Sequence, residues 1–118
     1  DTETIRGYIG ICDKLGISAL AETHDAQEMQ SAVRAGARLI GVNNRNLGTF
    51  HTDVNNSFKL VDKMRGFSPL LVSESGISET DTVRRLREAG FRGFLIGETF
   101  MKTERPGDTL ADFIGGLA

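Results

Sequence analysis

The architecture can be worked out from one stretch, Glu88-Ala89-Gly90-Phe91-Arg92-Gly93-Phe94-Leu95-Ile96-Gly97. Its first glycine follows a segment with helical spacing and precedes a short apolar run. A glycine directly after a helix adopts the left-handed conformation that ends the helix, and a short apolar run after it is typical of a strand. Gly16 and Gly36 stand in the same setting, before the apolar runs 17–21 and 37–42. The repeat predicts a helix-to-strand unit used several times along the chain.

The remaining segments extend this unit into an alternating order. Four strands are predicted, centred near Leu20, Ile40, Val72 and Leu95. Each is a continuous apolar run, as expected for a parallel sheet covered on both faces. Helices are expected before the first strand, between successive strands, and finally near 110–118. The sequence therefore predicts an α/β fold built from parallel βα repeats.

Three of these helices carry start signals. Asp25 and Ser78 each stand three residues before an acidic residue, a spacing at or near that of a capping box. Asn55 and Asn56 precede a run with helical spacing and are expected to cap it. All four residues are therefore predicted to lie at helix N-termini.

Composition narrows the class of protein. The chain has 118 residues, of which 39% are hydrophobic and 25% are charged, as in an ordinary single globular domain. A formal charge of −2 gives no reason to expect nucleic acid or an anionic membrane as a partner. No apolar run approaches the ~18 residues of a membrane span. The single cysteine, Cys12, excludes an internal disulfide framework, and a reducing cytoplasm is the expected compartment.

Polar residues follow every predicted strand. These strand ends are residues 22–25, 43–46, 73–76 and 97–99. A doubly wound sheet gathers its ligand groups at one switch point, whereas a barrel gathers them at the carboxyl ends of all its strands. Four polar ends out of four favour half of an eight-stranded barrel over an open sheet.

The last two strand ends predict a phosphate site. Phosphate sites in barrels commonly follow the last two strands and use backbone N–H groups. Gly76 and Gly97 allow close approach of the backbone to a phosphate, and Ser75 adds a hydroxyl donor. The alternative is that both glycines only make tight turns.

Other polar residues at the strand ends are candidates for chemistry. Asn43 and Arg45 face the same way on an alternating strand, and their alternative is an exposed polar loop. Burial at a strand end would suit Glu22 to proton transfer, although it could also be a structural acceptor. For Glu74, a substrate contact and a core-side ion pair stay equally open. His24 and His51 have no partner at metal-ligand spacing, so no metal site is expected.

At these strand ends the chain resembles indole-3-glycerol phosphate synthase, the barrel lyase of tryptophan biosynthesis. The matching stretches are 21–25, 40–47, 71–77 and 95–101, and the resemblance runs from about Ile5 to Leu117. The motifs Asn43-Asn44-Arg45 and Ser73-Glu74-Ser75-Gly76-Ile77, in this order and spacing, are quite specific. The resemblance covers nearly the whole chain.

The resemblance implies a cofactor-free reaction. The family closes 1-(2-carboxyphenylamino)-1-deoxyribulose 5-phosphate into indole-3-glycerol phosphate, with loss of carbon dioxide and water. Glu22 matches a catalytic glutamate that assists the proton transfers. Asn43 matches a substrate-positioning asparagine, Arg45 an arginine near the anthranilate end, and Glu74 a position lining the site. The residues that match the phosphate-binding loops are Ser75, Gly76, Gly97 and Glu98.

A barrel of this kind needs about 250 residues, so residues 1–118 are expected to form only its C-terminal half, strands five to eight. The family's catalytic lysines, including the general acid, and a further glutamate lie on earlier strands. The lysines of this chain fall on helices or outer loops, at Lys14, Lys59, Lys63 and Lys102. Four strands leave two edges unpaired, so self-association or pairing with an N-terminal half-barrel is expected. The alternatives are a non-catalytic phosphate-binding half-barrel and, more weakly, another phosphate-binding barrel lyase or isomerase.

Overall fold

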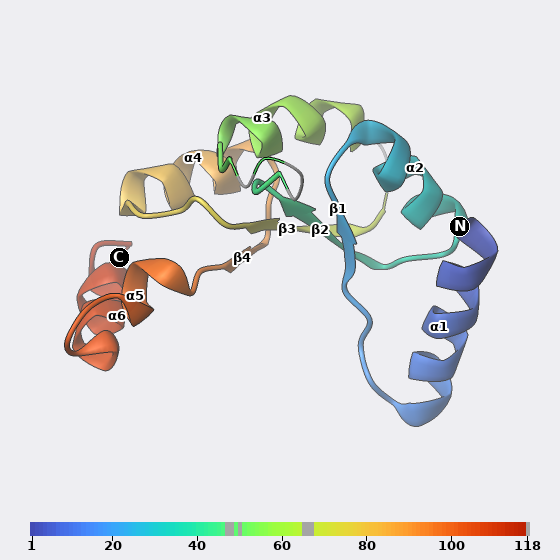
Figure 1. Ribbon diagram of the computed structural model, residues 1–118, viewed down its shortest axis with the longest axis horizontal. Helices are drawn as coiled ribbons and strands as arrows, with labels where there is room; N and C mark the ends of the chain where they lie inside the picture. Colours follow the sequence, from blue (N-terminus) through green and yellow to red (C-terminus); the bar gives the residue numbers. More distant parts are fainter. Residues whose placement is uncertain (47–48, 50, 65–67, 118) are drawn as a thin grey trace.

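The computed structural model describes residues 1–46, 49, 51–64 and 68–117, and within them strands alternate with helices (Figure 1). The strands are β1 (Ala21–Thr23), β2 (Leu39–Asn43), β3 (Leu70–Glu74) and β4 (Gly93–Leu95), in the sheet order β1-β2-β3-β4. All neighbouring strands pair in parallel, which confirms the predicted α/β class. The helical elements are α1 (Thr2–Leu15), α2 (Ala26–Arg34), α3 (Asn55–Val61), the 3₁₀ turn η1 (Asp62–Met64), α4 (Thr80–Ala89), α5 (Glu98–Met101) and α6 (Pro106–Gly115).

The predicted glycine stops are confirmed. Gly16, Gly36 and Gly90 have φ angles of 72°, 91° and 130°, a region that side chains other than hydrogen rarely tolerate. Asp25 caps α2 as expected, because its carboxylate accepts a hydrogen bond of 2.8 Å from the backbone N–H of Glu28.

The cap predictions at Asn55, Asn56 and Ser78 are wrong. Asn55 lies inside α3, and its N–H donates to Asp53 Oδ1 at 2.9 Å. The Asn56 amide instead donates to the carbonyls of His24, directly after β1, and of Asn43, the last residue of β2. Ser78 precedes Glu79, the N-cap of α4, which makes no side-chain capping bond. At Asn56, contacts with the strand ends have replaced the cap that local spacing predicted.

Two element bounds also differ from the prediction. The first strand is centred on Glu22 rather than near Leu20. The last helix starts earlier than residue 110, because Pro106 at its first position has the φ angle and the missing N–H that suit a helix start. Residue 118, the expected end of that helix, lies outside the described residues, as does Leu47 at the end of the matching stretch 40–47.

Helices α2, α3 and α4 lie along one face of the sheet, and the core is packed there (Figure 1). Because strand side chains alternate, Ile40, Val42 and Leu71 point toward these helices. They meet a set of fully buried helix and loop residues, Met29, Ala32, Val83, Leu86 and Phe91. The chain therefore completes this face by itself.

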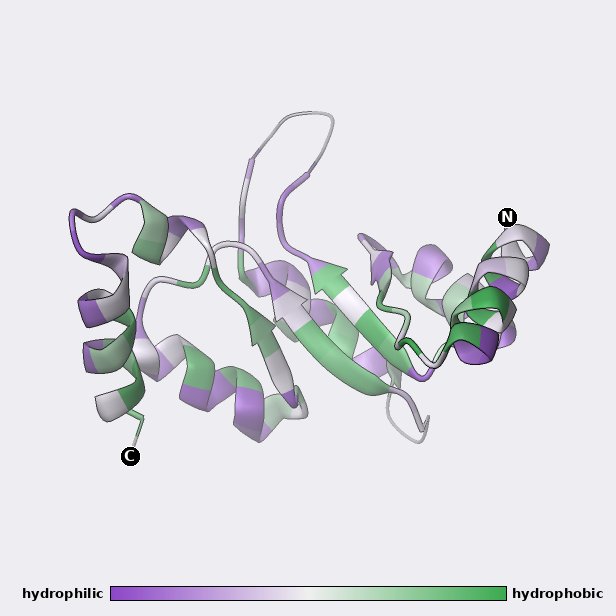
Figure 2. Cartoon of the chain, turned by 90° about the horizontal axis from the view of Figure 1, so that it is seen from below, coloured by the Kyte–Doolittle hydropathy of each residue, from purple (hydrophilic) through white to green (hydrophobic). Residues whose placement is uncertain are grey.

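The opposite face of the sheet is left uncovered (Figure 2). The register places Glu22, Gly41, Val72 and Gly93 in one row across this face. Leu70 lies on the same face two residues before Val72, and Leu95 lies there two residues after Gly93. Leu70 and Leu95 are 55% and 56% exposed. The radius of gyration is 15.1 Å, against about 13 to 14 Å for a compact domain of this length. The sheet is thus an open arc with an apolar inner face.

No helix within the described ranges is both long enough and apolar enough to cross a membrane.

Candidate active site

Two carboxyl groups meet on the uncovered face near the carboxyl end of the sheet. Glu22 comes from β1 and pairs with Gly41 of β2, whereas Glu74 comes from β3 and pairs with Asn43, two residues further along β2. A Cβ atom at Gly41 would stand 1.9 Å from Glu74 Oε2. The Glu74 side chain therefore occupies the space that any larger residue at position 41 would fill.

Burial dominates the chemistry of Glu74. The residue is 3% exposed, and its Oε2 has no hydrogen-bond partner in the part of the chain that the structure describes. Burial raises the pKa of Glu74 to about 7, with further upward contributions from the Glu22 charge and a hydrogen bond with Glu22, while His24 lowers it. Glu74 can therefore hold or release a proton near neutral pH. The sequence left open whether Glu74 contacts a substrate or forms an ion pair on the core side. Its side chain lies on the uncovered face, as a substrate contact requires.

Asn43 orients the second carboxyl group. Its Nδ2 donates to Glu22 Oε1 at 2.9 Å, and its Oδ1 accepts from the backbone N–H of Arg45 at 3.0 Å. Both ends of the amide are therefore fixed. The Glu22 side chain is 46% exposed, so it remains open to a ligand on the inner face.

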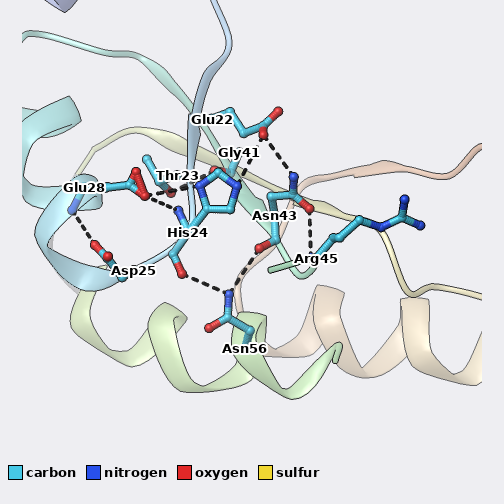
Figure 3. A network of polar contacts seen from close by, with 9 residues as sticks. All are labelled: Glu22, Thr23, His24, Asp25, Glu28, Gly41, Asn43, Arg45 and Asn56. Carbon is cyan, nitrogen blue, oxygen red and sulfur yellow. Dashed lines mark hydrogen bonds and ion pairs between the residues drawn. The ribbon is translucent and has the colours of Figure 1, made fainter. Parts of the chain in front are cut away.

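His24 joins this cluster, which sequence reasoning missed (Figure 3). Its Nε2 lies 3.6 Å from Glu22 Oε1, and its Nδ1 lies 3.2 Å from Glu28 Oε1. The spacing in the sequence was a signal that could have found it. Glu22 lies two residues before His24 at the end of a strand, and Glu28 lies four residues after it in the first turn of a helix, so the three side chains can converge. Within the described residues, no three His, Cys, Asp or Glu side chains are arranged to hold a metal ion.

The other predicted residues line a hollow of about 800 Å³ beside this cluster. Its walls include Arg45, Ser75, Gly76, Gly97 and Glu98. Ser75 and Gly76 are both left-handed, with φ of 71° and 75°. The N–H groups of Gly76 and Gly97 have no acceptor among the described residues. Because both glycines line the hollow, these N–H groups are available to a ligand bound there.

Asn44 fixes the Ser75 turn from behind. This buried amide donates to Ser75 O at 2.9 Å and to Ser73 Oγ at 3.2 Å. Its Oδ1 accepts from the N–H of Ser57 at 3.0 Å and from the Ser57 hydroxyl at 2.8 Å. Adjacent asparagines therefore serve opposite faces of the sheet: Asn43 the open one and Asn44 the packed one.

Charged groups at the hollow have particular partners. Arg45 donates to Glu98 Oε2 at 3.1 Å and to Thr52 Oγ1 at 3.3 Å, so its guanidinium lies on the hollow's side rather than against Glu22. The Glu98 side chain is 75% exposed. Lys102, expected on a helix or an outer loop, is the C-cap of the short helix α5 and also lines the hollow.

Comparison with known proteins agrees with this arrangement. The family model for indole-3-glycerol phosphate synthase matches residues 1–113. The chain is 55% identical over 104 residues to indole-3-glycerol phosphate synthase of Bacteroides thetaiotaomicron, covering 88% of this chain and 39% of that protein. It is 45% identical over 115 residues to the enzyme of Ruminiclostridium cellulolyticum, covering 98% and 44%.

Solved structures agree on the fold. The crystal structure of a 3-hexulose-6-phosphate synthase matches with a TM-score of 0.79 and 16% identity, covering 100% of this chain and 58% of that one. The four parallel strands thus match part of a TIM barrel. The chain spans about two fifths of the length of the curated relatives it matches. By its sequence and the matching family model, it belongs to the indole-3-glycerol phosphate synthase family.

Proposed function

We propose that the chain supplies strands five to eight of a TIM barrel that forms indole-3-glycerol phosphate from 1-(2-carboxyphenylamino)-1-deoxyribulose 5-phosphate, with loss of carbon dioxide and water. The observation that carries this proposal is the position of the Glu22–Glu74 pair directly beside a hollow with free backbone donors. A domain that only bound phosphate would have no need of the carboxyl pair. Family membership also supports a cytoplasmic location.

In this proposal Glu22 moves protons. Its carboxylate is held by Asn43 and is open to the inner face. After ring closure, loss of carbon dioxide from the ring carbon that carried the carboxylate restores the benzene ring. Glu22 then takes a proton from the methylene carbon next to the nitrogen, as the hydroxyl on the neighbouring ring carbon leaves as water. Glu74 lines the site beside it. Because burial raises the pKa of Glu74 to about 7, its protonated form can donate a hydrogen bond to a carboxylate on the substrate instead of repelling it.

The phosphate group occupies the hollow in this proposal. The free N–H groups of Gly76 and Gly97 and the hydroxyl of Ser75 provide donors. Glu98 contributes through its backbone, because its side chain carries the wrong charge and is paired with Arg45. That ion pair also orients the guanidinium at the edge of the hollow, where it meets the remainder of the substrate. Lys102 supplies a positive charge to the phosphate.

The proposal assigns the general acid to the other half of the barrel. The dehydration step needs a proton donor at the leaving hydroxyl, and the described lysine that lines the hollow, Lys102, stands at the phosphate end. We propose that the open face pairs with an N-terminal half-barrel or, in its absence, with a second copy. The exposed Leu70 and Leu95 support such a partner.

The place of the general acid favours a second candidate, a phosphate-binding half-barrel without turnover. The hollow and its donors lie within this chain, whereas the acid needed for dehydration does not stand beside Glu22. The two candidates share the phosphate site and differ only in chemistry.

Turnover by the chain joined to an N-terminal half-barrel that carries the general acid separates them. Indole fluorescence reports product formation from the carboxyphenylamino-deoxyribulose phosphate, and calorimetry reports ligand binding. The enzyme proposal expects turnover that falls at least 100-fold in Glu22→Gln with ligand affinity unchanged, the order of loss for a proton-transfer group. Binding without turnover supports the binding module. Equal loss of affinity and turnover in Glu22→Gln overturns the catalytic assignment, and absence of both binding and turnover overturns both candidates.

A further inference from the structure

His24 lies between two carboxyl groups that come from different elements. Glu22 Oε1 is 3.6 Å from its Nε2, and Glu28 Oε1 is 3.2 Å from its Nδ1 (Figure 3). Glu28 Oε1 also accepts from the backbone N–H of His24 at 3.1 Å. A single carboxylate at the start of α2 therefore holds both the backbone and the ring of this residue.

This contact fixes which ring nitrogen carries a proton. An ionised carboxylate only accepts hydrogen bonds, so Nδ1 must donate to Glu28. Nε2 then faces Glu22 either as a bare acceptor or, in the charged ring, as a second donor. The Nε2 atom is buried and has no hydrogen-bond partner among the described residues. An orphan nitrogen aimed at a carboxyl group of the candidate site calls for an explanation beyond packing.

The cluster around the ring is acidic. The charged groups that face His24 are Glu22 from its own strand end, Glu28 from α2 and Glu74 from β3. Asn43 adds a neutral donor to the same Glu22 oxygen that His24 approaches. Without the ring, two carboxyl groups on the inner face would stand side by side with no positive charge beside them.

We propose that His24, oriented by Glu28, is a positioning residue that holds Glu22 in place and supplies the positive charge that balances the Glu22–Glu74 pair. The inference deepens the proposed function, since it concerns the groups that would move protons there. His24 acts through the carboxyl pair and does not itself touch the substrate.

The primary test is a carboxyl titration of the whole 118-residue chain. The protein is labelled with ¹³C in the glutamate side chains, and the signal of Glu74 is assigned by its loss in Glu74→Gln. In His24→Gln the midpoint of Glu74 is expected to rise by several tenths of a pH unit above its wild-type value, because a positive charge is lost. The matched control is His51→Gln, since His51 is the chain's other histidine and is exposed. An unchanged midpoint in His24→Gln overturns the proposal.

A second measurement needs no variant at His24. Long-range ¹H–¹⁵N spectra of the imidazole side chains distinguish Nδ1–H from Nε2–H in the neutral ring. At a pH high enough to remove the charge from the ring, wild-type His24 is expected in the Nδ1–H form, and Glu28→Gln is expected to return it toward the Nε2–H form that predominates in water. A wild-type ring with its proton on Nε2 overturns the proposal, even where His24→Gln fails to fold.

These readouts are separate from the proposed function. Binding of glycerol 3-phosphate is followed through the backbone amides of Gly76 and Gly97 and is expected to survive in His24→Gln. Loss of that binding in the wild type counts against the phosphate site, whereas the titration and the tautomer test only the role of His24.

Discussion

The two faces of this sheet differ in burial and in how fully their polar groups are hydrogen-bonded. On the helix-covered face, Ile40 and Val42 are fully buried and the polar groups at the strand ends bond to one another. On the open face, Leu70 and Leu95 are more than half exposed, and Glu74 keeps an oxygen without a partner within the described residues. The covered face has the satisfied contacts that hold a fold together. The open face has the unsatisfied groups that a ligand or a second half-barrel would complete.

The neighbouring residues Asn43 and Asn44 allow the two faces to be compared directly, because Asn43 lies on the open face and Asn44 on the covered face. Asn44→Ala is expected to lower the free energy of unfolding by about 3 kcal/mol, because Ser57, Ser73 and the Ser75 carbonyl lose a buried partner. Asn43→Ala is expected to cost less than about 1 kcal/mol, since its partner Glu22 can turn to water. Urea denaturation of both variants provides the measurement. Equal losses would mean that the open face contributes to stability as much as the covered one.

Glu74 makes the stability contributed by the open face depend on pH. Its pKa is raised from 4.5 to about 7, so the unfolded chain loses this proton first as pH increases. The contribution of Glu74 to stability is therefore present below about pH 4.5, is lost between about 4.5 and 7, and stays lost above that range. Relative to Glu74→Gln, the wild type should lose on the order of 2 kcal/mol across this window.

The control for this pH effect is Glu88→Gln, because Glu88 is exposed on α4. Urea denaturation at several pH values compares the three proteins. A wild type that follows the same pH dependence as Glu74→Gln would show that the open face does not penalise the charged carboxylate.

The smallest expected effect on stability belongs to Leu95. Leu95→Lys replaces an exposed apolar side chain on the open face, so monomer stability should change by no more than about 0.5 kcal/mol. Self-association, measured by light scattering over a range of concentrations, should weaken strongly because a charge enters the proposed contact. A wild-type chain that stays monomeric at all concentrations would contradict pairing through this face.

The strand and helix pattern was open to prediction from the sequence because it depends on local chemistry. Glycines with positive φ end three of the helices, and short apolar runs after them form strands. The cap at Asn56 was mispredicted because its side chain bonds instead to carbonyls at the ends of two strands, which local spacing does not encode. Local rules identify the elements better than they identify their exact ends.

The candidate site was predictable in its residue types and less so in its interactions. Glu22 and Ser75 stood out because polar residues end apolar strands. The contact of Glu74 with the empty position at Gly41 depends on register between two strands, which no local pattern encodes. The convergence of His24 on Glu22 and Glu28 likewise depends on how β1 leads into α2.

The central claim is that the open face ends in a site for a phosphorylated ligand beside the carboxyl pair. A titration of the ¹⁵N-labelled chain with glycerol 3-phosphate tests it most directly, with glycerol as the matched ligand that lacks phosphate. The account predicts saturable shifts of the Gly76 and Gly97 amide signals with the phosphorylated ligand and none with glycerol. Shifts that are absent, equal for both ligands, or centred on residues away from these two loops would contradict it.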